Sequence, residues 1–185
     1  FYVALARTQV FNSKSEEAAR SAEDALLIDP NSAQAHAVYA WALDFQGGEE
    51  NLTKALEEID KAIQIDPNSA LAQAYLAEIL MDSSPENYKE ALDAAQRAVQ
   101  IDPNLLEAHR ALGYVWELTA NYQNAMLSYE TALRINPNLA ILHISMGNML
   151  LNQGDTNTAI SSYLQASQLM PTFHSTRTLR EIGQR

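Results

Sequence analysis

Apolar and small residues recur along the chain at spacings of three and four, which places them on one face of an α-helix. Prolines interrupt this pattern at intervals of 37, 36, 34 and 34 residues, and four of the five stand in nearly the same phrase, Ile-Asp-Pro-Asn or Ile-Asn-Pro-Asn. Proline lacks an amide hydrogen and forces its predecessor out of helical dihedral angles, so the preceding helix must stop. The pattern therefore predicts a series of repeated helical units that end at Pro30, Pro67, Pro103, Pro137 and Pro171.

A break in the middle of each unit predicts two helices per unit. A polar residue stands four positions before an alanine in four units, and we expect these residues to cap the second helices: Asn51, Asn87, Asn121 and Asp155. In the first unit, Ser13 and Glu16 have the spacing of a capping box. With a terminal helix over 172–185, the chain is expected to form eleven helices and no strand.

The units share residue types at fixed offsets. The fourth unit has His109, Leu112, Gly113, Trp116, Ala125, Tyr129, Ala132 and Pro137, and the fifth matches it with His143, Met146, Gly147, Leu150, Ala159, Tyr163, Ala166 and Pro171. This pattern resembles the tetratricopeptide repeat family. The resemblance implies an all-α fold, a right-handed superhelical solenoid of antiparallel helix pairs. The whole chain, 1–185, is then a single array with repeats at about 1–32, 33–69, 70–105, 106–139 and 140–173.

The small residues of the pattern predict close packing. Gly113 and Gly147 are expected where the two helices of a unit approach each other, and Ala132 and Ala166 where successive units meet. A single unit cannot bury its own apolar face, so neighbouring units must stack.

The resemblance also implies where a partner binds, because in this family the first helices line a concave groove. The groove-facing stripe is varied in this sequence, and its aromatic residues are expected to face solvent as anchors for a partner. The candidate groove residues are Arg7, Trp41, Asp44, Glu78, Met81, Arg110, Tyr114, Glu117 and Asn148. Two plainer interpretations stay open: Glu107 and Arg110 form a surface pair, and Trp41 packs on a neighbouring helix.

Charge and composition exclude several classes of function. The net charge of −11 disfavours nucleic acid and anionic membranes, and no apolar run is long enough to span a bilayer. The sequence has no cysteine, no phosphate-binding loop and no His-Glu-x-x-His motif, so neither catalytic residues nor a cofactor is expected. His36, His109 and His143 occupy equivalent positions in their units. Equivalent positions in stacked units lie about 10 Å apart, too far to share a metal ion, and we interpret these histidines as substitutes for a packed aromatic residue.

These observations predict a protein–protein interaction module that holds a peptide or protein segment in the concave groove. Because the stripe has no lysine, a clamp for an acidic C-terminus is not expected. One alternative is self-assembly into a homo-oligomer or scaffold. Another is a regulatory region of a larger protein whose enzymatic domain lies outside this fragment.

Overall fold

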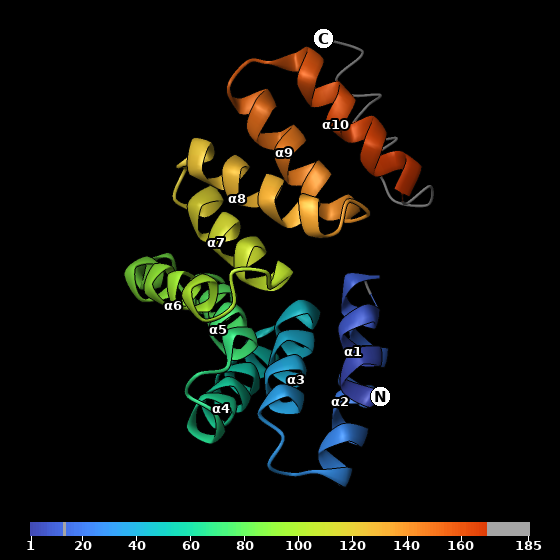
Figure 1. The fold of residues 1–185 in the computed structure, drawn as a ribbon, viewed down its shortest axis with the longest axis vertical. Helices are drawn as coiled ribbons and strands as arrows, with labels where there is room; N and C mark the ends of the chain where they lie inside the picture. Colours follow the sequence, from blue (N-terminus) through green and yellow to red (C-terminus); the bar gives the residue numbers. More distant parts are fainter. Residues whose placement is uncertain (13, 170–185) are drawn as a thin grey trace.

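The computed structural model describes residues 1–12 and 14–169, and all regular structure in these ranges is helical. Antiparallel helices follow one another in five pairs (Figure 1). The pairs are α1 (Tyr2–Phe11) with α2 (Ser15–Ile28), α3 (Ala33–Gln46) with α4 (Glu49–Ile65), α5 (Ala70–Ser83) with α6 (Tyr88–Ile101), α7 (Leu106–Leu118) with α8 (Tyr122–Ile135), and α9 (Ala140–Asn152) with α10 (Thr156–Leu169); a short 3-10 helix, η1 (Pro85–Asn87), precedes α6. The predicted all-α solenoid of helix pairs is thus confirmed. The expected terminal helix lies outside the described residues.

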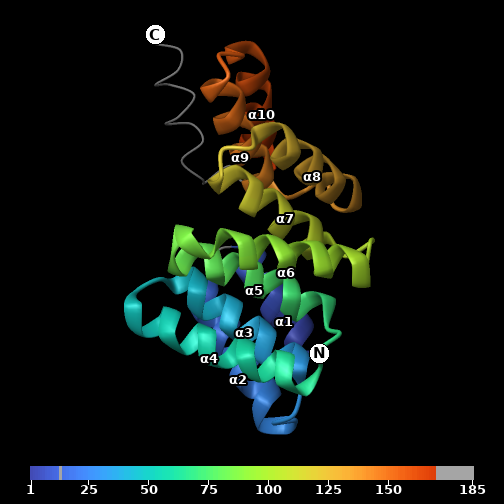
Figure 2. The same ribbon diagram turned by 90° about the vertical axis from the view of Figure 1, so that its left-hand side faces the viewer.

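The first helices of successive pairs pack side by side. α1 contacts α3, α3 contacts α5 and α5 contacts α7, while the second helices cover the outside of this layer (Figure 2). The last pair departs from this order, because it joins the array mainly through α8 and α9, and α7 and α9 have little direct contact. The stack also curls, so that α1 reaches α7 through a hydrogen bond between the side chains of Arg7 and Glu107.

The ends of the helices follow the repeated proline phrase. In each of four phrases the Asp or Asn side chain accepts a hydrogen bond from the amide two residues later, at 3.0 to 3.1 Å. Ser32 and Ser69 then cap α3 and α5 by accepting from Ala35 and Ala72, both at 3.3 Å. Each proline phrase therefore ends one helix with a side-chain turn, and two of them lead into a serine cap.

The predicted caps of the second helices are only partly correct. Asp155 accepts from the amide of Thr158 at 3.2 Å, as expected. Asn87 and Asn121 stand at the N-cap positions, but their side chains make no capping bond. Asn51 lies inside α4, which begins two residues earlier after Gly48. Ser13 lies outside the described residues.

The repeated histidines do more than fill space. The Nε2 atoms of His36, His109 and His143 lie 2.9, 2.8 and 3.2 Å from the carbonyl oxygen of the proline six residues earlier. Each ring therefore links the first turn of a helix to the proline segment at which the previous helix ends. Our interpretation of these residues as plain substitutes for an aromatic ring was incomplete.

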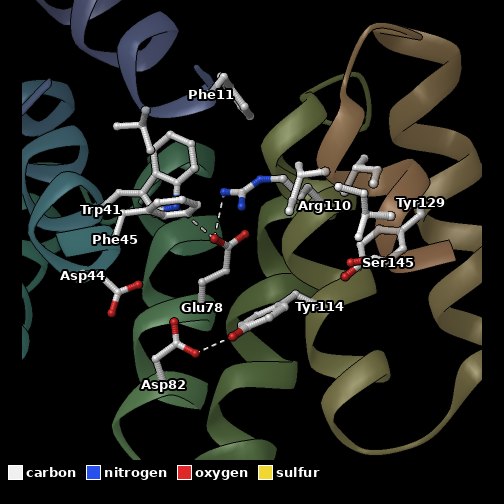
Figure 3. Close-up of a pocket in the computed structure, with 14 residues that line it drawn as sticks. Phe11, Trp41, Asp44, Phe45, Glu78, Asp82, Arg110, Tyr114, Tyr129 and Ser145 are labelled. Atoms are coloured by element: carbon white, nitrogen blue, oxygen red, sulfur yellow. Dashed lines mark hydrogen bonds and ion pairs between the residues drawn. The ribbon is translucent and has the colours of Figure 1, made fainter. Parts of the chain in front are cut away.

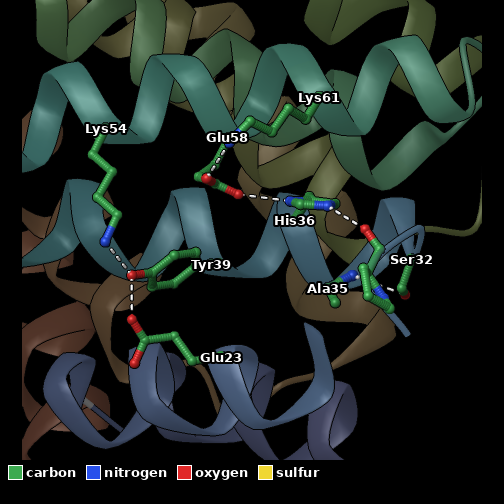
Figure 4. Close-up of polar contacts among 9 residues, drawn as sticks. Glu23, Ser32, Ala35, His36, Tyr39, Lys54, Glu58 and Lys61 are labelled. Atoms are coloured by element: carbon green, nitrogen blue, oxygen red, sulfur yellow. Dashed lines mark hydrogen bonds and ion pairs between the residues drawn. The ribbon is translucent and has the colours of Figure 1, made fainter. Parts of the chain in front are cut away.

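His36 has a second acceptor. Its Nδ1 atom lies 2.6 Å from a Glu58 carboxylate oxygen, and the other oxygen of this carboxylate receives a bond from Lys61 (Figure 4). Burial tends to raise the pKa of Glu58, but the bonds from Lys61 and His36 outweigh it and lower that pKa. Both ring nitrogens of His36 therefore lie within hydrogen-bond distance of an acceptor. A second, partly buried network of hydrogen bonds joins Glu23 on α2, Tyr39 on α3 and Lys54 on α4.

The glycine positions confirm the predicted close contacts. A Cβ atom on Gly113 would lie 2.4 Å from the Tyr129 ring, and one on Gly147 would lie 2.7 Å from the Tyr163 ring. Ala132 and Ala166 are also buried. The tyrosine of the second helix thus fills the space that the glycine of the first helix leaves open.

Candidate functional site

The concave side of the array contains a cavity of about 250 Å³. All five first helices contribute to its lining (Figure 3). The lining residues are Val10, Phe11, Trp41, Asp44, Phe45, Glu78, Asp82, Arg110, Tyr114, Tyr129, Ile141, Leu142, Ile144 and Ser145. Residues far apart in the sequence meet here because α1, α3, α5 and α7 lie next to each other and α9 faces the same cavity.

One wall of the cavity is aromatic and is built around Trp41. The indole ring stacks on Tyr75 with a centroid distance of 4.5 Å, and it meets Phe11 and Phe45 edge to face at 5.1 and 5.7 Å. Trp41 is only 1% exposed, so the expectation that it faces solvent was wrong. The plainer interpretation, that it packs on a neighbouring helix, is confirmed. Phe45, at 47% exposed, is the aromatic residue of this wall that is open to a partner.

Arg110 and Glu78 form a buried ion pair beneath this wall. Arg110 Nη2 lies 2.8 Å from Glu78 Oε2, and the guanidinium lies 4.4 Å from the centre of the Trp41 ring. The indole N–H donates to the same Glu78 oxygen at 3.0 Å. Glu78 Oε1 is buried and has no hydrogen-bond partner. The plainer interpretation of Arg110, that it forms a surface pair with Glu107, was wrong because both residues are buried with other partners.

Two further carboxylates, Asp44 and Asp82, complete the polar side of the cavity. Tyr114 donates its hydroxyl hydrogen to Asp82, and burial together with this bond raises the pKa of Tyr114 well above its ordinary value. Burial and the neighbouring carboxylate of Asp82 raise the pKa of Asp44 to about 8. Burial raises the pKa of Glu78 to about 7, although Arg110 and the Trp41 indole favour its ionised form. The site therefore carries more acid groups than its single guanidinium can balance.

The remaining predicted groove residues lie outside the cavity lining. Arg7 donates from Nε to Glu107 Oε1 at 2.9 Å. Met81 is buried. Glu117 and Asn148 accept the hydroxyl hydrogens of Tyr129 and Tyr163 at 2.7 and 2.6 Å. The structure thus brings together five of the nine candidates: Trp41, Asp44, Glu78, Arg110 and Tyr114.

Phe11, Phe45 and Asp82 line the cavity but were not among the candidates. Phe45 and Asp82 each follow directly after a residue of the predicted stripe, in the last turn of α3 and α5. Because the helices continue to this turn, the neighbouring side chains also reach the cavity edge. Extending the stripe by one residue at the helix ends would have found both.

Comparison with protein families decides the identity of the fold. Models of the tetratricopeptide repeat match residues 3–70, 48–105, 86–140 and 128–161. The chain belongs to the tetratricopeptide repeat family. Members of this family are typically protein-interaction modules and not enzymes. No curated protein matches the sequence significantly.

Several solved structures share the fold. A thermophilic TPR protein of Thermus thermophilus superposes with a TM-score of 0.80 at 16% identity, covering 100% of this chain and 98% of that one. PilF of Pseudomonas aeruginosa gives 0.62 at 24% identity, covering 98% and 87%. YrrB, described as a TPR protein with an unusual peptide-binding site, gives 0.60 at 19% identity, covering 97% and 90%. Among the described residues of this tetratricopeptide repeat chain, no helix is long and apolar enough to cross a membrane.

Proposed function

We propose that the array is a non-catalytic module that binds a segment of another protein in its concave cavity. The observation that carries this proposal is the cavity itself, to which every first helix contributes a side chain. Its volume of about 250 Å³ lies below the ~300–1,000 Å³ of typical small-molecule pockets. This size suits one or two side chains of a partner better than a cofactor.

The rim of the cavity supports the same function. Phe45 on α3 and Ile141 on α9 both line the cavity and are 47% and 44% exposed, so they can contact an apolar side chain. Buried aromatic contacts with charged residues nearby are the usual composition of a strong contact point between proteins. YrrB, a structural relative, is described as having a peptide-binding site, which is consistent with this use of the fold.

A random peptide library displayed on phage tests the proposal. A photo-crosslinking residue replaces either Phe45 at the cavity rim or Gln165, which is exposed on α10 outside the cavity. We expect selected peptides to crosslink at position 45 and not at position 165. Crosslinking at 165 alone, or at neither position, contradicts binding in the concave cavity.

Self-assembly is the second candidate, and exposed apolar residues favour it. Leu27 and Ile28, at the end of α2, leave most of their surface open to solvent. Such a pair can bury its apolar surface against a second copy of the chain. Sedimentation velocity over a range of concentrations should then show a dimer that the Leu27→Glu/Ile28→Glu variant abolishes. A monomer at every concentration contradicts this candidate.

A further inference from the structure

The polar side of the cavity contains an imbalance of charge. Asp44, Asp82 and Glu78 line it, and Arg110 is the one basic residue among the lining residues. Arg110 is already held by Glu78 and by the face of Trp41. No ion pair within residues 1–12 and 14–169 involves Asp44 or Asp82. The two aspartates therefore face the cavity without a positive partner from the described chain.

Glu78 provides an independent sign that a donor is missing. The residue is 4% exposed, and its buried Oε1 atom has no hydrogen-bond partner, as is also true of Nε and Nη2 of Arg110, whose guanidinium pairs with the other oxygen. Figure 3 shows this carboxylate beside the cavity, between Arg110 and Tyr114. An unpaired buried acceptor is costly, and more so when it carries charge. A donor that enters the cavity would remove this cost.

We propose that the cavity binds the positively charged side chain of an arginine or lysine in a partner protein, between the carboxylates of Asp44 and Asp82. This inference rests on the proposed function and names the chemistry of the segment that binds. A neighbouring apolar residue of the partner contacts Phe45 and Ile141 at the rim.

Physical chemistry favours this occupant over a neutral one. A guanidinium carries five N–H donors in a fixed plane, and an ammonium carries three, so either can bond several acceptors at once. Hydrogen bonds between charged groups are roughly twice as strong as neutral ones. Burial and the neighbouring carboxylate of Asp82 raise the pKa of Asp44, and a bound cation would favour its ionised form.

Trp41 provides a reporter for the test. Its indole N–H donates to Glu78, so its nitrogen–proton signal responds to any change at that carboxylate. The second tryptophan, Trp116, does not line the cavity and serves as an internal control. A Trp116→Phe variant assigns the two indole signals.

The ¹⁵N-labelled protein is titrated with blocked pentapeptides in which one central residue stands between two leucines. We expect the arginine and lysine peptides to shift the Trp41 signal and leave Trp116 unchanged. Replacement of arginine by citrulline, which has the same shape without the charge, should weaken binding at least tenfold. Equal binding of the citrulline or glutamate peptide overturns the inference, as does no shift with millimolar arginine peptide or the same shift with Mg²⁺ alone.

Two variants separate the site from general electrostatics. Asp44→Asn/Asp82→Asn should weaken the arginine peptide at least tenfold, whereas Asp60→Asn removes an exposed charge on α4 and should leave binding unchanged. Unchanged binding to the double variant overturns the inference. The proposed function fails separately if no phage peptide crosslinks at position 45. If phage peptides crosslink there but contain no basic residue, the proposed function stands and this inference is overturned.

Discussion

Arg7 and Glu107 are joined by a hydrogen bond of 2.9 Å from Nε to Oε1, although 100 positions of the chain separate them. Arg7 lies on α1 and Glu107 at the start of α7, so the bond links the first helix pair to the fourth. In a simple stack, each unit contacts only its neighbours, and stability is close to a sum of neighbouring terms. This bond adds a contact between two units that are not neighbours in the sequence.

We expect Arg7→Met to destabilise the protein by about 2–4 kcal/mol. Glu107 is 1% exposed, and removing its partner leaves a buried carboxylate without a cation. Urea denaturation measures the change in the free energy of unfolding. The Arg7→Met/Glu107→Gln double variant should recover part of the loss. Lys14→Met, which breaks an exposed pair with Glu17, should cost less than about 1 kcal/mol. Equal effects of the two single variants would show that the long-range pair adds nothing.

Gly113→Ala should cost about 1–3 kcal/mol, because the added Cβ atom would lie 2.4 Å from the Tyr129 ring and the ring must move. Gly147→Ala, with a distance of 2.7 Å to Tyr163, should show a similar loss. Combining Gly113→Ala with Tyr129→Leu should recover part of the stability, since the smaller side chain gives room. Thermal denaturation of the single and double variants checks this. If the losses of stability caused by Gly113→Ala and Tyr129→Leu simply add in the double variant, the proposed clash is excluded.

Trp41→Ala should lower stability by about 3–5 kcal/mol, because it empties a buried site between Phe11, Phe45 and Tyr75. Trp41→Phe keeps an aromatic ring but loses the bond to Glu78, so its loss should be smaller. Calorimetric melting distinguishes the two variants. A melting temperature unchanged by Trp41→Ala would contradict the burial of this residue. Binding studies should for this reason alter Phe45 instead of Trp41.

Asp44→Asn should stabilise the free protein more at pH 8 than at pH 5. The pKa of Asp44 rises from 3.8 to about 8 on folding, so between these values the folded state holds a proton that the unfolded chain releases. The stability that this group contributes therefore falls as the pH rises from 3.8 to about 8. Asparagine cannot ionise and escapes the loss. For a chain of this size, each kcal/mol regained adds about 2–4 °C to Tm.

Melting curves of Asp44→Asn and wild type at pH 5 and pH 8 measure this difference, with Asp60→Asn as the control for charge. A gain that is independent of pH would show that Asp44 ionises normally in the folded protein. The same variant is expected to weaken binding of the arginine peptide, so greater stability and lost affinity should appear together.

The repeated positions were predictable because each depends only on its own unit. Gly113 and Tyr129 lie 16 residues apart in one helix pair, and their contact follows from the fixed offsets of the family pattern. The cavity was less predictable, since Asp44 and Asp82 meet only through the angle between successive pairs. The curl of the stack is an accumulated property that no single repeat encodes. This curl buries Trp41 and joins Arg7 to Glu107. Because the repeat pattern does not contain it, the sequence predicted more exposed groove residues than the structure has.

The attachment of the last helix pair has a consequence for the entry of a partner. Helices α1 to α7 are held by serial packing and by the bond between Arg7 and Glu107, whereas α9 is attached chiefly through α8. Ile141, Leu142 and Ile144 all lie on α9, so their position in the cavity depends on how α9 packs against α8. We therefore expect a bulky partner residue to be accommodated more readily on this side of the cavity than on the side formed by α3, α5 and α7.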